Sequence, residues 1–151
     1  MSATRTNLYP NILLVEDNPG DVRLTQEAMK ESKSRCILNV VGDGEEAIMY
    51  LQNKGEYSEV PRPDLILLDL NLPKLSGREV LQRIKQMDQV KSIPVVVLTT
   101  STAQEDIVSS YALHANCYIT KPSDLDDFIG AIQQIETFWL SLASLPSPEF
   151  T

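Results

Sequence analysis

The sequence predicts an α/β fold in which helices cover both faces of a five-stranded parallel sheet. Short apolar runs alternate five times with longer amphipathic stretches along the 151 residues, which indicates successive strand and helix units. The run at residues 65–68 is apolar on both faces, as in a buried central parallel strand. No internal repeat or low-complexity segment interrupts this pattern, so one domain with one core is expected.

Turn and cap residues separate the predicted strands from the predicted helices. Pro19 suits the first turn of a helix, where its missing N–H has no partner to lose. Asp43 and Gly44 suit a cap and turn, and Ser-Asp-Leu-Asp from Ser123 resembles a capping box. A flavodoxin-like doubly wound strand order, 2-1-3-4-5, is expected for such a chain. The predicted strands are residues 12–15, 37–41, 65–68, 94–98 and 116–120, and the predicted helices are residues 19–32, 45–54, 77–87, 104–113 and 123–142.

The predicted domain covers residues 11–142, between an N-terminal extension of residues 1–10 and a C-terminal tail of residues 143–151. The net charge of −8 opposes binding to nucleic acid. No apolar run approaches the roughly 20 residues of a membrane span, and no secretory signal is apparent, so a cytoplasmic location is expected. Cys36 and Cys117 are expected to be buried free thiols. The lone His114 has no partner ligand nearby in sequence.

Polar residues collect where the predicted strands end. Ligands of parallel α/β sheets bind beyond the carboxyl ends of the strands, so these side chains are expected to form one site. Glu16 and Asp17 follow the first strand, Asp69 follows the third, Thr99 ends the fourth and Lys121 follows the fifth.

The residue types at these ends suit phosphoryl transfer. Three facing carboxylates repel one another strongly without a cation between them, and hard oxygen ligands with room for water suit Mg²⁺. Lys121 supplies a positive charge for a phosphate oxygen, and the Thr99 hydroxyl can donate a hydrogen bond to the same group. An aspartate can act as the nucleophile, so Asp69 is predicted to accept a phosphoryl group.

Each residue taken alone has a simpler interpretation. Glu16 and Asp17 could cap the following helix, and Asp69 could be a turn residue at a strand end. Lys121 alone suits a solvated surface, and Thr99 alone suits a strand end. The joint occurrence of all five at the ends of adjacent strands favours the phosphoryl-acceptor site.

From Asn11 to about Leu142 the sequence resembles the receiver domain of two-component response regulators. The fold and the site predicted above agree with that resemblance. It rests on Leu-Val-Glu-Asp-Asn at 14–18, Asp-Leu-Asn-Leu-Pro at 69–73 with Gly77, Val-Leu-Thr at 97–99 and Lys-Pro at 121–122.

The resemblance implies a role for each acidic residue of the site. Asp69 would be the phosphoacceptor, and Lys121 would pair with the phosphoryl oxygens. Glu16 and Asp17 would hold Mg²⁺ together with Asp69, with Asp17 the more direct ligand. Asn71 would offer its backbone carbonyl to the same metal ion.

Three further residues take expected roles from the resemblance. Thr99 would be the switch hydroxyl that moves toward the phosphoryl group. Tyr118 falls at the position of a rotating aromatic residue, although a simple β-strand aromatic is the alternative. The peptide bond before Pro122 would be cis.

Phosphorylation adds a charge of about −1.5 to −2 and three acceptor oxygens to Asp69. That charge is expected to draw Thr99 and Lys121 inward, with the loops that carry them. The surface formed by the fourth helix, the fifth strand and the fifth helix would change as a result. No output domain is recognised after the last helix, so the output is expected to be contact with a downstream protein.

The last predicted helix carries more apolar surface than one face of a sheet requires. Ile135, Trp139 and Leu142 continue an apolar stripe at steps of four and three, and Phe138 adds area beside it. Exposed aromatic residues of this kind mark interfaces. Homodimerisation through Phe138, Trp139 and Leu142 is therefore predicted.

A narrower resemblance concerns the phosphodonor. Four short segments are similar to the regulators that are paired with cyanobacterial phytochromes, which implies a light-regulated histidine kinase as the partner. These segments are Phe-Trp-Leu at 138–140, Leu-Pro at 145–146, Gly-Arg-Glu-Val-Leu at 77–81 and Leu-Thr-Thr at 98–100.

Three other functions suit the same fold class. A hydrolase that forms an aspartyl phosphate needs a general acid or base near the nucleophile, but Leu70 and Asn71 follow Asp69, and no cap segment is apparent. A flavin carrier needs a phosphate loop after the first strand, where Glu16 and Asp17 would repel a phosphate. A constitutive interaction module would not need this set of polar residues. The prediction is a response regulator rather than an enzyme.

Overall fold

The computed structural model describes residues 9–32 and 35–146, which form one five-stranded parallel sheet with helices. The strand order β2-β1-β3-β4-β5 confirms the predicted doubly wound fold. Residues 1–8 and 147–151, which make up most of the two predicted terminal segments, lie outside the described part. The strands are β1 (Asn11–Val15), β2 (Ile37–Val41), β3 (Leu65–Leu68), β4 (Val95–Thr99) and β5 (Cys117–Thr120). The helices are α1 (Pro19–Lys30), α2 (Gly44–Leu51), η1 (Gly55–Tyr57), α3 (Gly77–Gln86), α4 (Gln104–Ala112), α5 (Leu125–Glu136) and η2 (Thr137–Leu142).

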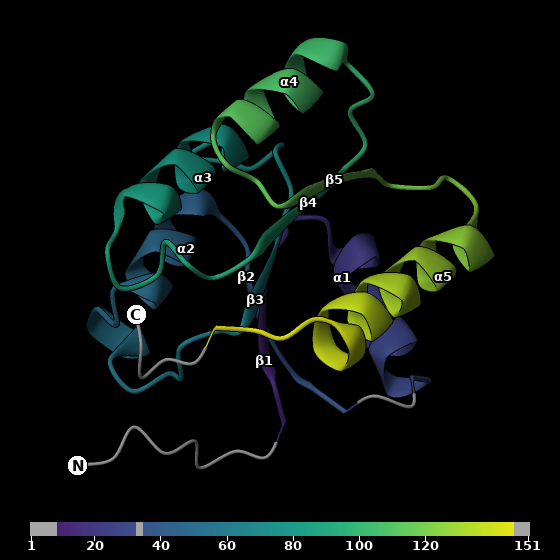
Figure 1. The fold of residues 1–151 in the computed structure, drawn as a ribbon, viewed down its shortest axis with the longest axis horizontal. Helices are drawn as coiled ribbons and strands as arrows, with labels where there is room; N and C mark the ends of the chain where they lie inside the picture. Colours follow the sequence, from purple (N-terminus) through teal and green to yellow (C-terminus); the bar gives the residue numbers. More distant parts are fainter. Residues whose placement is uncertain (1–8, 33–34, 147–151) are drawn as a thin grey trace.

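The helices form two layers around the sheet. Figure 1 shows α1 and α5 on one face, and α2, α3 and α4 on the other. All four residues of β3 are fully buried, as its run of apolar residues predicts. Ile66 and Leu68 pack in the core beneath α2 and α3, whereas Leu65 and Leu67 pack in the core beneath α1 and α5. The central strand therefore supplies both cores and fixes the middle of the molecule.

Side-chain caps mark the start of four helices. Each cap accepts a backbone N–H of the first turn, which would otherwise have no partner. The predicted cap at Asp43 is confirmed, and the last helix is capped by Asp124 rather than by Ser123. The four capping residues are Asn18, Asp43, Ser76 and Asp124.

Helix α4 is held to the body of the molecule by few contacts. Its N-cap, Ala103, makes no side-chain hydrogen bond, and Ser110 is the one fully buried residue within the helix. Val108 and Tyr111 are 59% and 49% exposed. A helix with so little buried surface depends strongly on the individual contacts that remain.

The last helix changes its geometry after Glu136. The prediction that helical structure continues to Leu142 is confirmed, but residues 137–142 form the π-helix η2. In a π-helix each N–H bonds five residues back, as Ala143 does to the Phe138 carbonyl at 2.8 Å. Trp139 packs against the core beneath α1 and α5, while Phe138 and Leu142 are 51% and 74% exposed.

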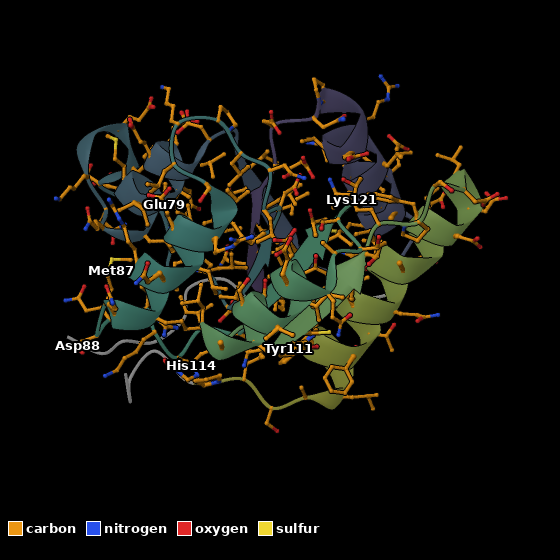
Figure 2. All side chains as sticks on the ribbon, turned by 90° about the horizontal axis from the view of Figure 1, so that it is seen from above. Glu79, Met87, Asp88, Tyr111, His114 and Lys121 are labelled. Atoms are coloured by element: carbon orange, nitrogen blue, oxygen red, sulfur yellow. The ribbon has the colours of Figure 1, made fainter. Side chains whose placement is uncertain are left out.

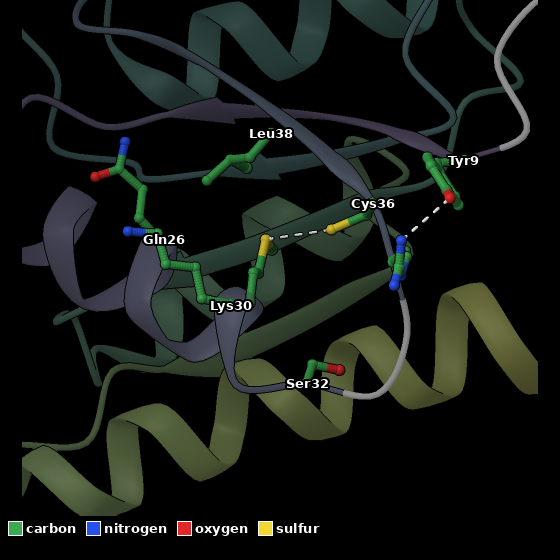
Figure 3. A pocket seen from close by; sticks show the side chains of 8 residues that line it. Tyr9, Gln26, Lys30, Ser32, Cys36 and Leu38 are labelled. Carbon is green, nitrogen blue, oxygen red and sulfur yellow. Dashed lines mark hydrogen bonds between the residues drawn. The ribbon is translucent and has the colours of Figure 1, made fainter.

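A buried carboxyl group lies where α5 approaches α1 and β2. Glu136 is fully buried, and its Oε2 lies 3.6 Å from Cys36 Sγ, which is also 3.6 Å from Met29 Sδ. Cys36 projects toward α1 in a cavity of about 720 Å³ (Figure 3). Cys36 and Cys117 are both free, as predicted, but they are half-buried rather than buried. Burial raises the pKa of Glu136, although hydrogen bonds from Ser32 and Cys36 oppose the rise.

Replacing Glu136 by glutamine is expected to remove part of the pH dependence of stability. Because the pKa is raised in the folded state, Glu136 keeps its proton at pH values where the unfolded chain, with a pKa of about 4.3, loses it. The free energy of unfolding therefore falls as the pH rises through this window, and it stays lower above the folded pKa. We expect Glu136→Gln to flatten this fall in urea denaturation curves measured between about pH 4 and pH 8.

Glu59→Gln is the matched control, because Glu59 is exposed. Its stability curve should follow that of the unchanged protein. If Glu136→Gln also followed that curve, Glu136 would not be the group that holds a proton in the folded state.

Candidate functional site

The carboxyl ends of the strands bring the predicted site residues to one edge of the sheet. Each of three site residues comes directly after its strand and donates its backbone N–H to a neighbouring strand. The sheet ladder therefore sets the positions of the site residues. These bonds join Glu16 to the Val41 carbonyl at 3.0 Å, Asp69 to the Val15 carbonyl at 3.1 Å and Lys121 to the Thr99 carbonyl at 2.7 Å.

The three predicted carboxylates of the site face one another. One carboxylate oxygen from each of Glu16, Asp17 and Asp69 lies within 4.8 Å of the other two. Glu16 and Asp69 are buried, and Asp17 is exposed. Oxygens that share one Mg²⁺ at about 2.0–2.1 Å lie about 3–4 Å apart, so small side-chain movements bring this set to the required geometry. The residues fit a hard divalent cation such as Mg²⁺ or Mn²⁺.

Lys121 supplies the positive charge of this cluster. Its Nζ lies 2.5 Å from Glu16 Oε1, 2.7 Å from Asp21 Oδ2 and 3.2 Å from Asp69 Oδ2. Figure 2 shows Lys121 well away from His114, which lies toward the opposite end of the strands. The lone histidine of the chain is therefore not part of the site.

The protonation of the buried groups follows from their surroundings. Burial raises the pKa of Glu16 to about 7, against the opposing effect of its hydrogen bond from Lys121. Burial alone lowers the pKa of Lys121, but hydrogen bonds to Asp21 and Glu16 outweigh it and raise the pKa above its ordinary value. Lys121 therefore stays cationic, and it contacts three carboxyl groups, with Asp17 close to two of them. A divalent cation offsets the remaining negative charge.

Asp21 is a member of the site that sequence reasoning missed. It lies in the first turn of α1, where an acidic residue has an ordinary role opposite the helix dipole. That role concealed its contact with Lys121, which is 100 residues away in the chain. The structure also shows that Asn18 caps α1, through bonds from the N–H groups of Gly20 and Asp21 at 2.9 and 3.1 Å. The acidic pair before Asn18 is therefore not used as the helix cap.

The Thr99 side chain is fully buried, and its Oγ1 has no hydrogen-bond partner within the described residues. A buried hydroxyl without a partner is costly, so such groups are rare and call for an explanation. Thr99 lies on β4, which pairs with β3, the strand that Asp69 directly follows. An acceptor oxygen arriving on Asp69 would give this hydroxyl a partner, which is the arrangement that the sequence predicts.

A close backbone approach supports the loop that carries Asp69. A Cβ atom at Gly77 would lie 2.1 Å from the Asp69 carbonyl oxygen and 2.5 Å from Leu70 Cα, so only glycine allows α3 to begin here. The Gly77 N–H donates to the Leu70 carbonyl at 3.0 Å. The Asn71 N–H donates to Asp69 Oδ1 at 3.2 Å, which orients the carboxylate. The metal contact expected of the Asn71 carbonyl stays a prediction.

Two further expectations have different outcomes. The Tyr118 hydroxyl donates to the Ser101 carbonyl at 2.9 Å, and its ring packs against the core beneath α2 and α3, so Tyr118 reaches the segment that follows β4. The expected cis bond before Pro122 is absent, because all described peptide bonds are trans. Nothing in the structure explains this difference from the expectation.

Comparison with known proteins agrees with the geometry of this site. Residues 12–133 match the response regulator receiver domain family. The chain belongs to this family. The receiver domain is 54% identical to the response regulator Rcp1 of Synechocystis sp. (strain ATCC 27184 / PCC 6803 / Kazusa) over 136 residues, which covers 90% of this chain and 92% of Rcp1.

Two solved structures resemble the receiver domain closely. The phosphorylated cyanobacterial phytochrome response regulator RcpA has a TM-score of 0.89 and 54% identity, over 92% of this chain and 99% of that chain. The Mn²⁺-bound form of Rcp1 has a TM-score of 0.88 and 53% identity, over 91% and 99%. Among the residues that the structure describes, no helix is long and apolar enough to span a membrane.

Replacing Lys121 by methionine is expected to strengthen divalent metal binding. The ammonium group shares two of its carboxylate partners, Glu16 and Asp69, with the proposed metal position. Its removal takes away a competing and repelling charge, so Mn²⁺ affinity measured by calorimetry should rise by roughly ten-fold. Lys54→Met, which removes an exposed lysine, is the control. Unchanged or weaker binding in Lys121→Met would show that the metal does not share these carboxylates.

Proposed function

We propose that this receiver domain accepts a phosphoryl group on Asp69 from a histidine kinase and signals by contact with other proteins. The observation that supports this most is the arrangement around Asp69. Its carboxylate lies 3.2 Å from Lys121 Nζ and next to the other two carboxylates of the metal-ligand set. On the neighbouring strand, the buried Thr99 hydroxyl has no partner in the described structure.

In the proposed reaction, a carboxylate oxygen of Asp69 attacks the phosphorus atom. A new O–P bond forms while the bond from phosphorus to the donor breaks, and the donor leaves with the electron pair. Lys121 neutralises a phosphoryl oxygen, and Thr99 donates a hydrogen bond to another. Glu16 and Asp17 would hold Mg²⁺ together with Asp69, and the bound ion would offset the charge on the transferred group.

Phosphorylation would be transmitted through the segments that follow β4 and β5. The added charge on Asp69 gives Thr99 an acceptor and Lys121 a new partner. Movement of these residues would alter the contacts of Tyr118 and the position of α4, which few contacts anchor. The surface of α4, β5 and α5 is therefore the proposed output surface, and a downstream protein is the proposed reader.

A light-regulated kinase of the phytochrome type is the proposed phosphodonor. The similarity to the phytochrome response regulator RcpA, over 92% of this chain, supports this choice. A cytoplasmic location fits it, because Cys36 and Cys117 are free thiols. Signalling by contact also accounts for the site without any role in turnover of a substrate.

Phosphorylation is tested by measuring intact mass. Incubation with Mg²⁺ and a small acyl phosphate is expected to add one phosphoryl group, and the gain should disappear in Asp69→Asn or when a chelator removes the metal. Asp88→Asn is the control, because Asp88 is exposed in the loop after α3. A phosphoryl group on Asp69→Asn, or none on the unchanged protein with either the small donor or a kinase, would contradict the proposal.

Homodimerisation through Phe138, Trp139 and Leu142 is a further part of the proposal. Phe138 and Leu142 are the exposed members. The ring of Trp139 packs edge to face against that of Phe138, with 5.1 Å between the ring centroids. A two-fold interface uses the same patch on both copies, so Phe138 of one copy could fill the groove of the other. The groove has a volume of about 400 Å³ and is lined by Gly130, Gln133, Gln134, Thr137, Phe138 and Leu142.

The double variant Phe138→Ser, Leu142→Ser is expected to sediment as a monomer, because it removes the exposed apolar part of the interface and leaves Trp139 in the core. Analytical ultracentrifugation at several concentrations gives the mass. Met49→Ser, which changes a 40% exposed apolar residue on α2, should sediment like the unchanged protein. A mass that stays the same in the double variant would exclude this surface.

A further inference from the structure

One carboxylate joins the first turn of α3 to the segment that follows β4. Asp106 in α4 accepts from Arg78 Nη2 through one oxygen, and from Ser101 Oγ at 2.6 Å through the other. Arg78 belongs to α3, and Ser101 lies between β4 and α4. The three side chains form a continuous link, which we name the Arg78–Asp106–Ser101 clamp.

One end of the clamp is fixed against the loop that carries Asp69. Arg78 directly follows Gly77. The backbone of Gly77 packs so closely against the Asp69 carbonyl that there is no room for a Cβ atom. The Gly77 N–H also bonds to the Leu70 carbonyl at 3.0 Å. A displacement of Arg78 backbone therefore requires a displacement beside Asp69.

The other end of the clamp belongs to the segment that carries Thr99. Ser101 is two residues after Thr99, and its carbonyl accepts from the Tyr118 hydroxyl at 2.9 Å and from Thr120 Oγ1 at 3.4 Å. Its Oγ also accepts from the Ala103 N–H at 3.2 Å. Ser101 thus has partners at both its carbonyl and its hydroxyl, whereas the Thr99 hydroxyl has none in the described structure.

The clamp also anchors the start of α4, which has no side-chain cap. Ala103 at the start of α4 offers no side-chain acceptor, and α4 buries one residue fully. Ser101 and Asp106 hold the first turn of α4 instead, and Arg78 fixes Asp106 from α3. Loss of this link would leave residues 99–103 less firmly tied to the loop that carries Asp69.

We propose that Arg78 and Asp106 are positioning residues for phosphoryl transfer. They hold residues 99–103 beside the loop that carries Asp69, so that a short movement brings the Thr99 hydroxyl to the incoming phosphoryl group. Neither residue touches the reacting atoms, and both act through Ser101. This inference rests on the proposed function and adds a determinant of its rate.

The exposure of the clamp sets the size of the expected effect. The Arg78 side chain is 50% exposed and that of Asp106 is 22% exposed, so solvent screens their ion pair. Loss of the clamp should therefore slow phosphorylation without abolishing it. We expect a rate about three- to ten-fold lower, because the segment samples several positions instead of one.

The first experiment measures the rate of phosphorylation by a small acyl phosphate at saturating Mg²⁺, read by intact mass. Arg78→Ala and Asp106→Ala should each slow the reaction, and the double variant should be no slower than the slower single variant, because both changes break one link. Arg78→Lys should recover most of the rate. Mn²⁺ affinity should stay unchanged in all of them, which a general disturbance of the site would not allow.

Matched controls lie on the same two helices. Arg83→Ala removes an exposed positive charge from α3, and Glu105→Ala removes an exposed negative charge from α4. Both controls should phosphorylate at the rate of the unchanged protein. Equal slowing in the controls, additive slowing in the double variant, or no slowing in the single variants would overturn the clamp.

A second experiment separates this inference from the proposed function. Amide hydrogen exchange of residues 100–106 in the unphosphorylated protein requires no phosphoryl transfer. We expect faster exchange in Arg78→Ala and Asp106→Ala than in the unchanged protein and both controls. If the protein accepted no phosphoryl group, the proposed function would fail, but the exchange measurement would still test the clamp. Equal exchange rates in all of the proteins would overturn the clamp.

Discussion

The concentration of negative charge at the carboxyl edge of the sheet is the constraint that shapes this receiver domain. Glu16, Asp21 and Asp69 contact one ammonium group, and Asp17 lies close to Glu16 and Asp69. Glu16 and Asp69 are buried. Such an arrangement is costly unless hydrogen bonds and cations satisfy it. The surrounding structure therefore has to keep these groups in place against their mutual repulsion. A parallel sheet does so for Glu16, Asp69 and Lys121, because each donates its backbone N–H to a neighbouring strand directly after its own strand ends.

The apolar core beneath the site makes this ladder rigid. β3 is fully buried and packs in both cores, so Asp69 at its end cannot relieve repulsion by moving into the molecule. Gly77 closes the loop on the other side, since its lack of a Cβ lets α3 start against the Asp69 carbonyl. The carboxylate therefore faces Lys121 and the other two carboxylates of the site. Packing and charge thus act together to hold this buried carboxylate beside the other groups of the site.

The strands and most of the site were predictable from sequence because each depends on a short, local pattern. Strands 37–41 and 65–68 agree with the structure to the residue, since runs of apolar residues flanked by turns leave little freedom. Asp21 was missed because its partner is distant in sequence and its helix position has an ordinary explanation. The π-helix after Glu136 was missed because its six residues are too few to show a repeat different from that of an α-helix. The half-burial of Trp139 follows from tertiary packing, which periodicity alone does not reveal.

Thr99 and Ser101, two residues apart, differ in how their hydroxyl groups are bonded. Thr99 has a buried hydroxyl without a partner in the described structure, so an acceptor on Asp69 relieves a cost that the resting protein carries. The Ser101 carbonyl accepts hydrogen bonds from two hydroxyl groups of β5. Its own hydroxyl accepts from the Ala103 N–H and donates to Asp106 of α4. Any movement of Thr99 toward a phosphoryl group must therefore stretch or carry along the contacts of Ser101. Because α4 buries only one of its residues fully, the proposed phosphorylation would act on a helix that a small change in free energy can shift.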